Sequence, residues 1–402
     1  MTMSDTESSE ADASTVEPSL EDSAQEVALD VRGLTKIYPD GTLAVDDIDF
    51  SINDGDFCVL IGPSGCGKST TLHSLVGKIP VTEGEIRLGD EEITDAPTYE
   101  RDIGLVFQDF QLFPHLTVGE NIEYGLQRLQ FDEDEQEKRV NDIVEMMRLE
   151  PLVDRQPEEL SAGQKQRVAL ARSMVLEPKL LLLDEPLGDM DYKLQKHMER
   201  ELLRLHRELD TTFVYVTHDQ TQAMRLADQI VVMNDGKVEQ SDSVERVYNE
   251  PATAFVSAFV GDSNTFTGEL TEVTDDGRYA HIDTPLGTFL ATTTNLRSEP
   301  TALVGEQIPF SVRPQYLEVD DELDNSVDCR VDDVIHQPGS GTQVILEATT
   351  ADGTAHELQL KSFDRIEPSE TVSIGWSADH ATLLEQTSVV DGIDLEKDIL
   401  GE

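Results

Sequence analysis

One glycine-rich stretch, GPSGCGKST at residues 62–70, constrains the fold of this 402-residue chain more than any other feature. It directly follows the apolar run FCVLIG (57–62), which predicts a buried strand, and it precedes a helical pattern. Glycines in such a turn allow backbone N–H groups to face an anion at a helix N-terminus. The pattern G-x-x-x-x-G-K-[ST] in this context predicts a site for a nucleoside triphosphate within an α/β domain.

The residues of this phosphate loop have distinct expected roles. Lys68 can reach the β- and γ-phosphates, and the Ser69 hydroxyl can ligate Mg²⁺. Further contacts with the phosphates are expected from Gly62, Pro63, Ser64, Gly65, Cys66, Gly67 and Thr70.

The stretch LLLLDEP (180–186) predicts a second part of the same site. A buried strand that ends in a carboxylate would direct Asp184 at the metal ion, usually through water. Glu185 follows immediately and is placed to orient or deprotonate an attacking water. Taken alone, the pattern is also typical of a solvated strand end, and the phosphate loop upstream favours the functional interpretation.

The pattern of the rest of the chain predicts an α/β domain followed by a small all-β domain. Strands are expected at 179–186 and 211–219, and a helix at 192–209. Two short helices split by Pro251 should precede short strands with Asp-Gly turns at 276–277 and 352–353. We predict an acidic disordered tail at 1–26, an ATP-binding domain at 27–262 with a helical subdomain at about 109–175, a β-domain at 263–386 and an acidic tail at 387–402.

Charge and composition limit the cellular setting. The chain has 82 acidic and 30 basic residues and a formal net charge of −52, which argues against nucleic acid as a partner. The simplest interpretation is a cytoplasmic protein adapted to very high salt, and a merely acidic protein is the alternative. The sequence contains no run of 18 or more apolar residues, so no membrane span is predicted. The N-terminus does not resemble a signal peptide. The three cysteines fit neither a disulfide framework nor a metal site.

The order of the motifs resembles that of the ATP-binding subunits of ABC transporters. The phosphate loop is followed by VFQDF, LSAGQ, LLLLDEP, GDMD and VTHD, and the resemblance runs from about residue 27 to 262. It implies a P-loop NTPase cassette with a mixed sheet and a helical subdomain, with ATP and Mg²⁺ as cofactors. Stretches at 308–319 and 372–384 are similar to the OB-like β-domain, called TOBE, of importer subunits.

In this family the LSGGQ signature of one subunit closes over the ATP held by the phosphate loop of a second subunit. The resemblance assigns that role to Ser161, Gly163 and Gln164. A helix N-terminus suits it, because unpaired N–H groups and the helix dipole attract the γ-phosphate. Ala162 replaces the usual glycine, and we expect activity to survive. The alternative is an N-capped helix with no partner.

The resemblance implies four further roles. Tyr38 would stack on adenine, Gln108 would sense Mg²⁺ and the attacking water, and His218 would contact the γ-phosphate. Asp191 would support the subunit interface. Each residue type in isolation is more often structural or solvated, so these assignments depend on the order of the motifs.

The implied partners are transmembrane permease subunits that bind region 108–118, and a second ATPase subunit that forms a homodimer or heterodimer. Core packing of Phe110, Leu112 and Phe113 is the alternative for that region. The subunit would lie at the cytoplasmic face of the cell membrane and serve an extracellular solute-binding protein indirectly. Stretches 191–209 and 231–240 resemble those of polyamine (spermidine/putrescine) importer subunits, and Tyr192 favours that group over the sugar importers. Sugars, iron(III), sulfate/molybdate and thiamine are the alternative substrates. Two rival functions are a soluble ABC ATPase that acts on ribosomes or DNA and an exporter ATPase.

Overall fold

The computed structural model describes most of the chain between the two predicted tails. Residues 1–25 and 385–402 lie outside the description, so the expected tails are not tested, and neither is Asp352 of the second Asp-Gly turn. The described residues are 26–128, 131–188, 190–209, 211–296, 298–320, 322–337, 341–350, 353–362, 368 and 370–384.

The centre of the cassette is a six-stranded sheet with the order β10-β9-β3-β8-β7-β6. All neighbours are parallel except β10, which runs antiparallel to β9. The apolar runs predicted as buried strands form β3, β7 and β8, and their residues are almost entirely buried. The six strands are β3 (Phe57–Ile61), β6 (Ile103–Val106), β7 (Leu180–Asp184), β8 (Thr212–Val216), β9 (Gln229–Asn234) and β10 (Lys237–Ser243).

A second, antiparallel sheet covers one face of the central sheet. Its order is β2-β1-β4-β5, and its apolar residues share one core with alternate residues of the central strands and with α1 (Lys68–Leu75). The resemblance implied a mixed sheet, but neither it nor the sequence patterns separated this layer. Its strands are β1 (Val27–Ile37), β2 (Leu43–Asn53), β4 (Glu83–Leu88) and β5 (Glu91–Glu92).

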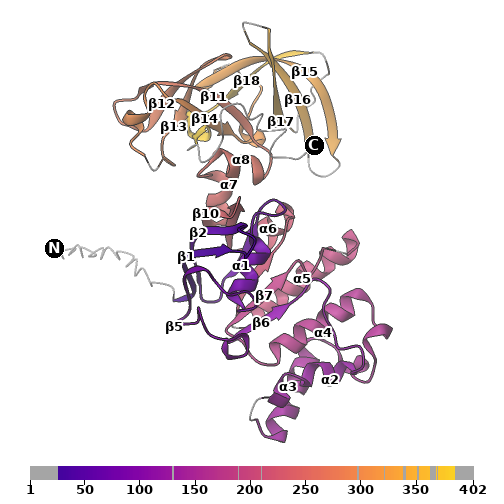
Figure 1. The fold of residues 1–402 in the computed structure, drawn as a ribbon. Helices are drawn as coiled ribbons and strands as arrows, with labels where there is room; N and C mark the ends of the chain where they lie inside the picture. Colours follow the sequence, from indigo (N-terminus) through magenta and orange to yellow (C-terminus); the bar gives the residue numbers. More distant parts are fainter. Residues whose placement is uncertain are drawn as a thin grey trace, which may run out of the picture.

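Helices cover the opposite face of the central sheet. The helix predicted at 192–209 is confirmed as α5 (Tyr192–Glu208), and its apolar residues join the core beneath the sheet. Figure 1 shows α2, α3 and α4 together at the end of the cassette that is farthest from the β-domain. These helices are α2 (Val118–Glu123), α3 (Glu133–Met146), α4 (Ala162–Met174) and α6 (Gln220–Leu226), with 3₁₀ turns η1 (Thr98–Glu100), η2 (Leu126–Arg128), η3 (Glu150–Leu152) and η4 (Pro157–Glu159).

Two short helices join the cassette to the β-domain, as the sequence predicted. They are α7 (Val244–Asn249) and α8 (Ala254–Phe259), on either side of Pro251. The buried Arg313 of the β-domain holds this connector through its guanidinium, which donates to the carbonyls of Tyr248, Ser257, Gly261 and Asp262 at 2.8–3.1 Å.

The β-domain consists of a closed five-stranded barrel and a second antiparallel sheet that share one core (Figure 1). The barrel has the order β11-β12-β13-β19-β14, and the second sheet has the order β17-β16-β15-β18. The expected turn at Asp276-Gly277 is present, with Gly277 at φ +70°. The elements are β11 (Asn264–Val273), β12 (Tyr279–Thr284), β13 (Gly287–Thr292), β14 (Gln307–Val312), β15 (Asn325–Gln337), β16 (Gly341–Thr349), β17 (Ala355–Ser362), β18 (Thr371–Trp376) and β19 (Thr382–Leu383), with 3₁₀ turns η5 (Pro300–Leu303), η6 (Pro314–Tyr316) and η7 (Ala378–His380).

Candidate functional site

The phosphate loop connects β3 to α1, as its sequence context predicted. Two of its glycines are required by close backbone approach. A Cβ at Gly62 would lie 2.2 Å from the carbonyl oxygen of Met233, and one at Gly67 would lie 2.6 Å from that of Ala44. Gly67 also has φ +104°, a left-handed conformation that begins α1 without a side-chain cap. The first N–H groups of α1 therefore have no side-chain acceptor at the cap and suit an anion.

Lys68 is the first residue of α1 and is 6% exposed. Its Nζ donates to the carbonyl oxygens of Gly62 and Pro63, each at 2.8 Å. The Lys68 ammonium group is thus bound to the backbone at the beginning of the phosphate loop. Within the loop, Ser64, Gly65 and Ser69 are exposed to solvent, whereas Cys66 is buried. Burial raises the pKa of the Cys66 thiol, which keeps it neutral.

Asp184 ends β7 beside the helix that the phosphate loop begins. Its Oδ2 atom lies 3.7 Å from Nε2 of His73 on α1. Burial raises the pKa of Asp184 despite His73, and burial together with Lys78 lowers the pKa of His73. His73 was missed by the sequence reasoning, because the residue that it meets, Asp184, lies far along the chain on another element.

Glu185 and His218 come from the ends of neighbouring parallel strands. The Nδ1 atom of His218 lies 3.2 Å from Oε2 of Glu185, and the backbone N–H of Glu185 donates to the carbonyl of Val216. Glu185 has φ +43°, a left-handed conformation that costs about 1–2 kcal/mol in a non-glycine residue. The His218 side chain is 65% exposed, so the pair is open to solvent on one side.

Gln108 lies near this pair. A Cβ placed at Gly188 would lie 3.6 Å from Nε2 of Gln108 and 3.7 Å from Oε2 of Glu185. The structure therefore brings Gln108, Glu185 and His218 to one edge of the sheet, where the carboxyl ends of β6, β7 and β8 meet.

Tyr38 follows β1 and lies against the phosphate-loop helix. Its hydroxyl is 3.3 Å from Oγ1 of Thr70, and Nζ of Lys36 lies 5.4 Å from the centre of its ring. The ring is half-buried. The contact with Thr70 places the hydroxyl end of the Tyr38 ring next to the end of the phosphate loop.

Ser161, Gly163 and Gln164 form the beginning of α4. Ser161 is the N-cap, and its Oγ accepts from the Gln164 N–H at 3.4 Å while the Gln164 side chain accepts from the Ser161 N–H at 2.9 Å. Gly163 is packed against α5, because a Cβ there would lie 3.2 Å from Cδ1 of Leu194. Among the described residues, no hydrogen bond joins these three to the phosphate loop of the same chain. Asp191 is the N-cap of α5, where its Oδ1 accepts from the Leu194 N–H.

Region 108–118 divides between core and surface. Phe110 and Leu112 pack against the main core, which is the structural alternative for these two residues. Phe113 packs at a tilt against Tyr124, which follows α2, with ring centres 4.4 Å apart. Gln111 is exposed.

The donor set of Ser69, Gln108 and Asp184 fits Mg²⁺. Mg²⁺ prefers hard oxygen ligands and commonly takes one or two carboxylates together with phosphate oxygens. Asp184 supplies a partly buried carboxylate, and Ser69 is exposed at the loop. Within the described ranges no cluster of three or more His, Cys, Asp or Glu residues is placed to hold a metal ion.

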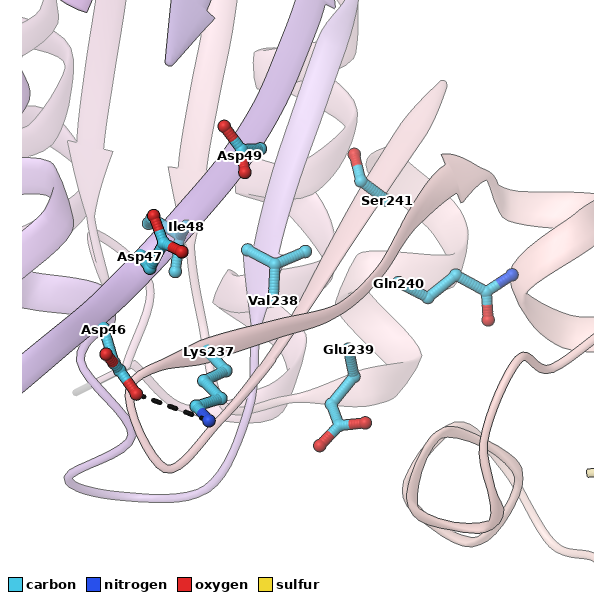
Figure 2. A pocket seen from close by; sticks show the side chains of 9 residues that line it. All are labelled: Asp46, Asp47, Ile48, Asp49, Lys237, Val238, Glu239, Gln240 and Ser241. Atoms are coloured by element: carbon cyan, nitrogen blue, oxygen red, sulfur yellow. Dashed lines mark ion pairs between the residues drawn. The ribbon is translucent and has the colours of Figure 1, made fainter. Parts of the chain in front are cut away.

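A cavity of about 600 Å³ lies between β2 and β10. Figure 2 shows its carboxylates and the ion pair between Lys237 and Asp46, whose Nζ and Oδ2 atoms are 3.3 Å apart. The cavity begins beside the phosphate loop, because the N–H of Asp46 donates to Gly236 and the N–H of Gly236 donates to Cys66. None of the residues predicted for the nucleotide site lines it.

Comparisons with known proteins identify similar sequences over most of the chain. A family model described as ABC transporter matches residues 45–188, and one described as TOBE domain matches residues 310–384. The spermidine/putrescine import ATP-binding protein PotA of Rubrobacter xylanophilus is 41% identical over 361 residues, which are 89% of this chain and 94% of that protein. The sn-glycerol-3-phosphate import ATP-binding protein UgpC of Rhodopseudomonas palustris is 47% identical over 231 residues, 58% of this chain and 64% of that protein.

A solved structure is similar to the cassette. The cbiO1 protein from Clostridium perfringens, described as part of the ABC transporter complex cbiONQ, matches with a TM-score of 0.53 and 32% identity, covering 56% of this chain and 92% of that one. The described part of the chain contains no helix that is long and apolar enough to cross a membrane.

Proposed function

Because the chain belongs to the ATP-binding subunits of ABC transporters, in which ATP hydrolysis powers transport, we propose that it energises the import of polyamines of the spermidine/putrescine class. The observation that best supports this substrate class is the length of the match to PotA. That match spans 89% of the chain and so includes most of the β-domain, whereas the match to UgpC covers 58%. Similarity that extends through both domains supports the polyamine class over glycerol phosphate.

The proposed catalytic arrangement assigns one task to each residue of the sheet edge. Glu185 orients or deprotonates the attacking water, and His218, 3.2 Å away, contacts the γ-phosphate. Lys68 binds the β- and γ-phosphates from the phosphate loop, and Tyr38 packs against adenine. Ser69, Gln108 and Asp184 would hold Mg²⁺, which supplies charge neutralisation on the phosphates when bound.

We propose that two copies, or this chain and a second ATPase subunit, pair head to tail. Ser161, Gly163 and Gln164 of one subunit then face the nucleotide of the other. The start of α4 is open to a partner, since Ser161 and Ala162 are exposed, and this supports a site completed by a second subunit. Asp191 supports the interface from the beginning of α5.

A transmembrane permease is the second partner in this proposal. Region 108–118 binds it, which places the subunit at the cytoplasmic face of the membrane as a peripheral protein. An extracellular solute-binding protein would deliver the substrate without touching this chain.

Uptake measurements in the source organism test the substrate class. Deletion of the gene should abolish uptake of radiolabelled putrescine or spermidine while uptake of glycerol 3-phosphate continues. The wild-type gene should restore polyamine uptake, and the Lys68→Ala variant should not. Loss of glycerol 3-phosphate uptake with intact polyamine uptake would contradict the proposal.

The permease partner has a separate test. Glu185→Gln with Mg·ATP, affinity-purified from host membranes in molar salt, should bring down a multi-span membrane protein that mass spectrometry can identify. Recovery of ribosomes or DNA-repair proteins without a permease would favour the soluble class of ABC ATPase.

A further inference from the structure

Two consecutive residues in region 108–118 have a backbone conformation that L-amino acids avoid. Phe110 has φ +60° and Gln111 has φ +43°. A left-handed conformation brings Cβ close to the next carbonyl, so two such residues in a row need an external restraint. The restraint acts on the carbonyl oxygens of the same two residues, which accept hydrogen bonds from a side chain of α4.

Arg172 of α4 binds both carbonyls. Its Nη1 donates to Gln111 at 2.7 Å and its Nη2 donates to Phe110 at 3.0 Å. Its guanidinium also lies over the ring of Phe113, 5.3 Å from the ring centre. Burial lowers the pKa of Arg172, but an arginine remains charged at physiological pH. A positive charge therefore contacts both the backbone carbonyls of this loop and the Phe113 ring.

The far side of the loop is fixed to α2. The buried amide of Asn121 donates to the carbonyls of Phe113, Leu116 and Thr117, and its oxygen accepts from the Phe113 N–H at 2.8 Å. The second half of the loop is therefore bound to α2, and its first half, at 110–111, is bound by Arg172.

Arg172 belongs to the helix that begins at Ser161. Ten residues separate it from Ala162, so it lies about 15 Å along the axis of α4 from the capped end. The next residue, Ser173, donates from its hydroxyl to the carbonyl of Leu105 on β6 at 3.0 Å. The end of α4 is thus joined both to the loop and to the strand that leads into Gln108.

We propose that Arg172 is a positioning residue that couples region 108–118 to the N-terminus of α4, so that a displacement of one moves the other. The inference rests on the proposed function, in which the first of these elements binds the permease and the second faces the nucleotide. In this proposal Arg172 acts through the Phe110 and Gln111 carbonyls and the Phe113 ring.

Hydrogen exchange of the full-length chain tests the coupling. Mass spectrometry would follow peptides from the phosphate loop, from the start of α4 and from 110–118, a range that leaves out the proposed Mg²⁺ ligand Gln108, in molar salt, with and without Mg·AMP-PNP. In the wild type we expect the analogue to protect the phosphate loop and to change exchange at 110–118. In Arg172→Gln we expect the phosphate-loop protection to persist and the response at 110–118 to be lost.

Arg167→Gln is the matched control. It removes the same charge from the same helix, but the Arg167 side chain donates to Met147 at 3.3 Å and not to the loop. This variant should keep the wild-type response. Arg172→Lys keeps the charge but not the planar two-pronged donor, so it should give a reduced response with unchanged folding, and it decides the matter where Arg172→Gln fails to fold.

The outcomes separate this inference from the proposed function. Failure of Mg·AMP-PNP to protect the phosphate loop of the wild type would contradict nucleotide binding itself. Protection there without any response at 110–118, a full response in Arg172→Gln or Arg172→Lys, or an equal loss in Arg167→Gln would each overturn the role of Arg172.

Discussion

The Glu185 carboxylate and the His218 imidazole lie 3.2 Å apart, although 33 residues separate them in the chain. They meet because β7 and β8 are parallel neighbours whose carboxyl ends lie at the same edge of the sheet. The left-handed backbone of Glu185 turns its side chain at the point where the strand stops.

Replacement of Glu185 by Gln should separate nucleotide binding from hydrolysis. Removal of a general base typically slows turnover by about 10²–10⁴-fold, and the amide leaves the phosphate loop intact. Steady-state phosphate release and equilibrium ATP binding would measure the two effects. Glu245→Gln, at an exposed position of α7, is the control with the same charge change. Near-normal hydrolysis by Glu185→Gln would reject Glu185 as the base.

At the start of α4, replacing Ala162 by Gly and Gly163 by Ala should have different effects on stability. The Ala162 side chain is exposed, so Ala162→Gly should change the free energy of unfolding by less than about 1 kcal/mol and leave hydrolysis intact. Gly163→Ala adds a methyl group 3.2 Å from Cδ1 of Leu194, and overpacking of α4 on α5, at about 1–3 kcal/mol, should outweigh the roughly 1 kcal/mol that alanine gains over glycine in a helix. Chemical denaturation in molar salt would compare them, and a larger loss for Ala162→Gly would contradict this packing argument.

The ionised Asp184 carboxylate is expected to lower the free energy of unfolding. Burial raises its pKa in the folded protein, so the folded state binds this proton more tightly than the unfolded chain, and stability falls as pH rises through the folded-state pKa. Asp184→Asn should therefore have a higher melting temperature than the wild type near pH 7, with an advantage that shrinks as the pH falls. Asp275→Asn, an exposed exchange, should show no such trend. A lower melting temperature for Asp184→Asn at pH 7 would show that the charge is stabilising.

Arg313 is expected to control the attachment of the β-domain. Arg313→Met would leave the carbonyls of Tyr248, Ser257 and Gly261 without their donor, at a cost of about 2–4 kcal/mol. Limited proteolysis should then cut the connector near α7 and α8 faster than in the wild type. Arg278→Met, on the exposed turn before β12, should leave cleavage unchanged. Equal cleavage rates in the two variants would contradict the role of Arg313.

The net charge of −52 predicts a strong salt dependence. At about 0.1 M salt the Debye length is about 10 Å and carboxylates repel one another, whereas about 1 M salt reduces it to about 3 Å. The melting temperature should rise steadily with KCl concentration over this range. A melting temperature that is indifferent to salt would reject the interpretation of the protein as halophilic.

Local patterns in the sequence were sufficient for the features that depend on nearby residues. Apolar runs predicted β3, β7 and β8, and the leucine spacing predicted α5. The Ser161 cap was predictable because its partner, Gln164, is three residues away.

Features that depend on distant residues could not be predicted in the same way. Arg172 binds carbonyls 61 and 62 residues earlier in the chain, and Arg313 binds carbonyls more than 50 residues earlier. Nothing local distinguishes these arginines from solvated ones. The separate antiparallel layer was also missed, because alternation in β1 and β2 reveals a covered face but not which sheet covers it.

The barrel of the β-domain has a consequence for the order in which the protein forms during synthesis. Its first strand begins at Asn264, but β19 at Thr382–Leu383 is needed to join β13 to β14. A ribosome that adds about 5–20 residues per second would therefore leave this barrel open for on the order of ten seconds after β11 has been made. During that interval the cassette can already fold, while β13 and β14 present unpaired edges to other nascent chains. We therefore expect chaperone dependence to be concentrated in the second half of translation.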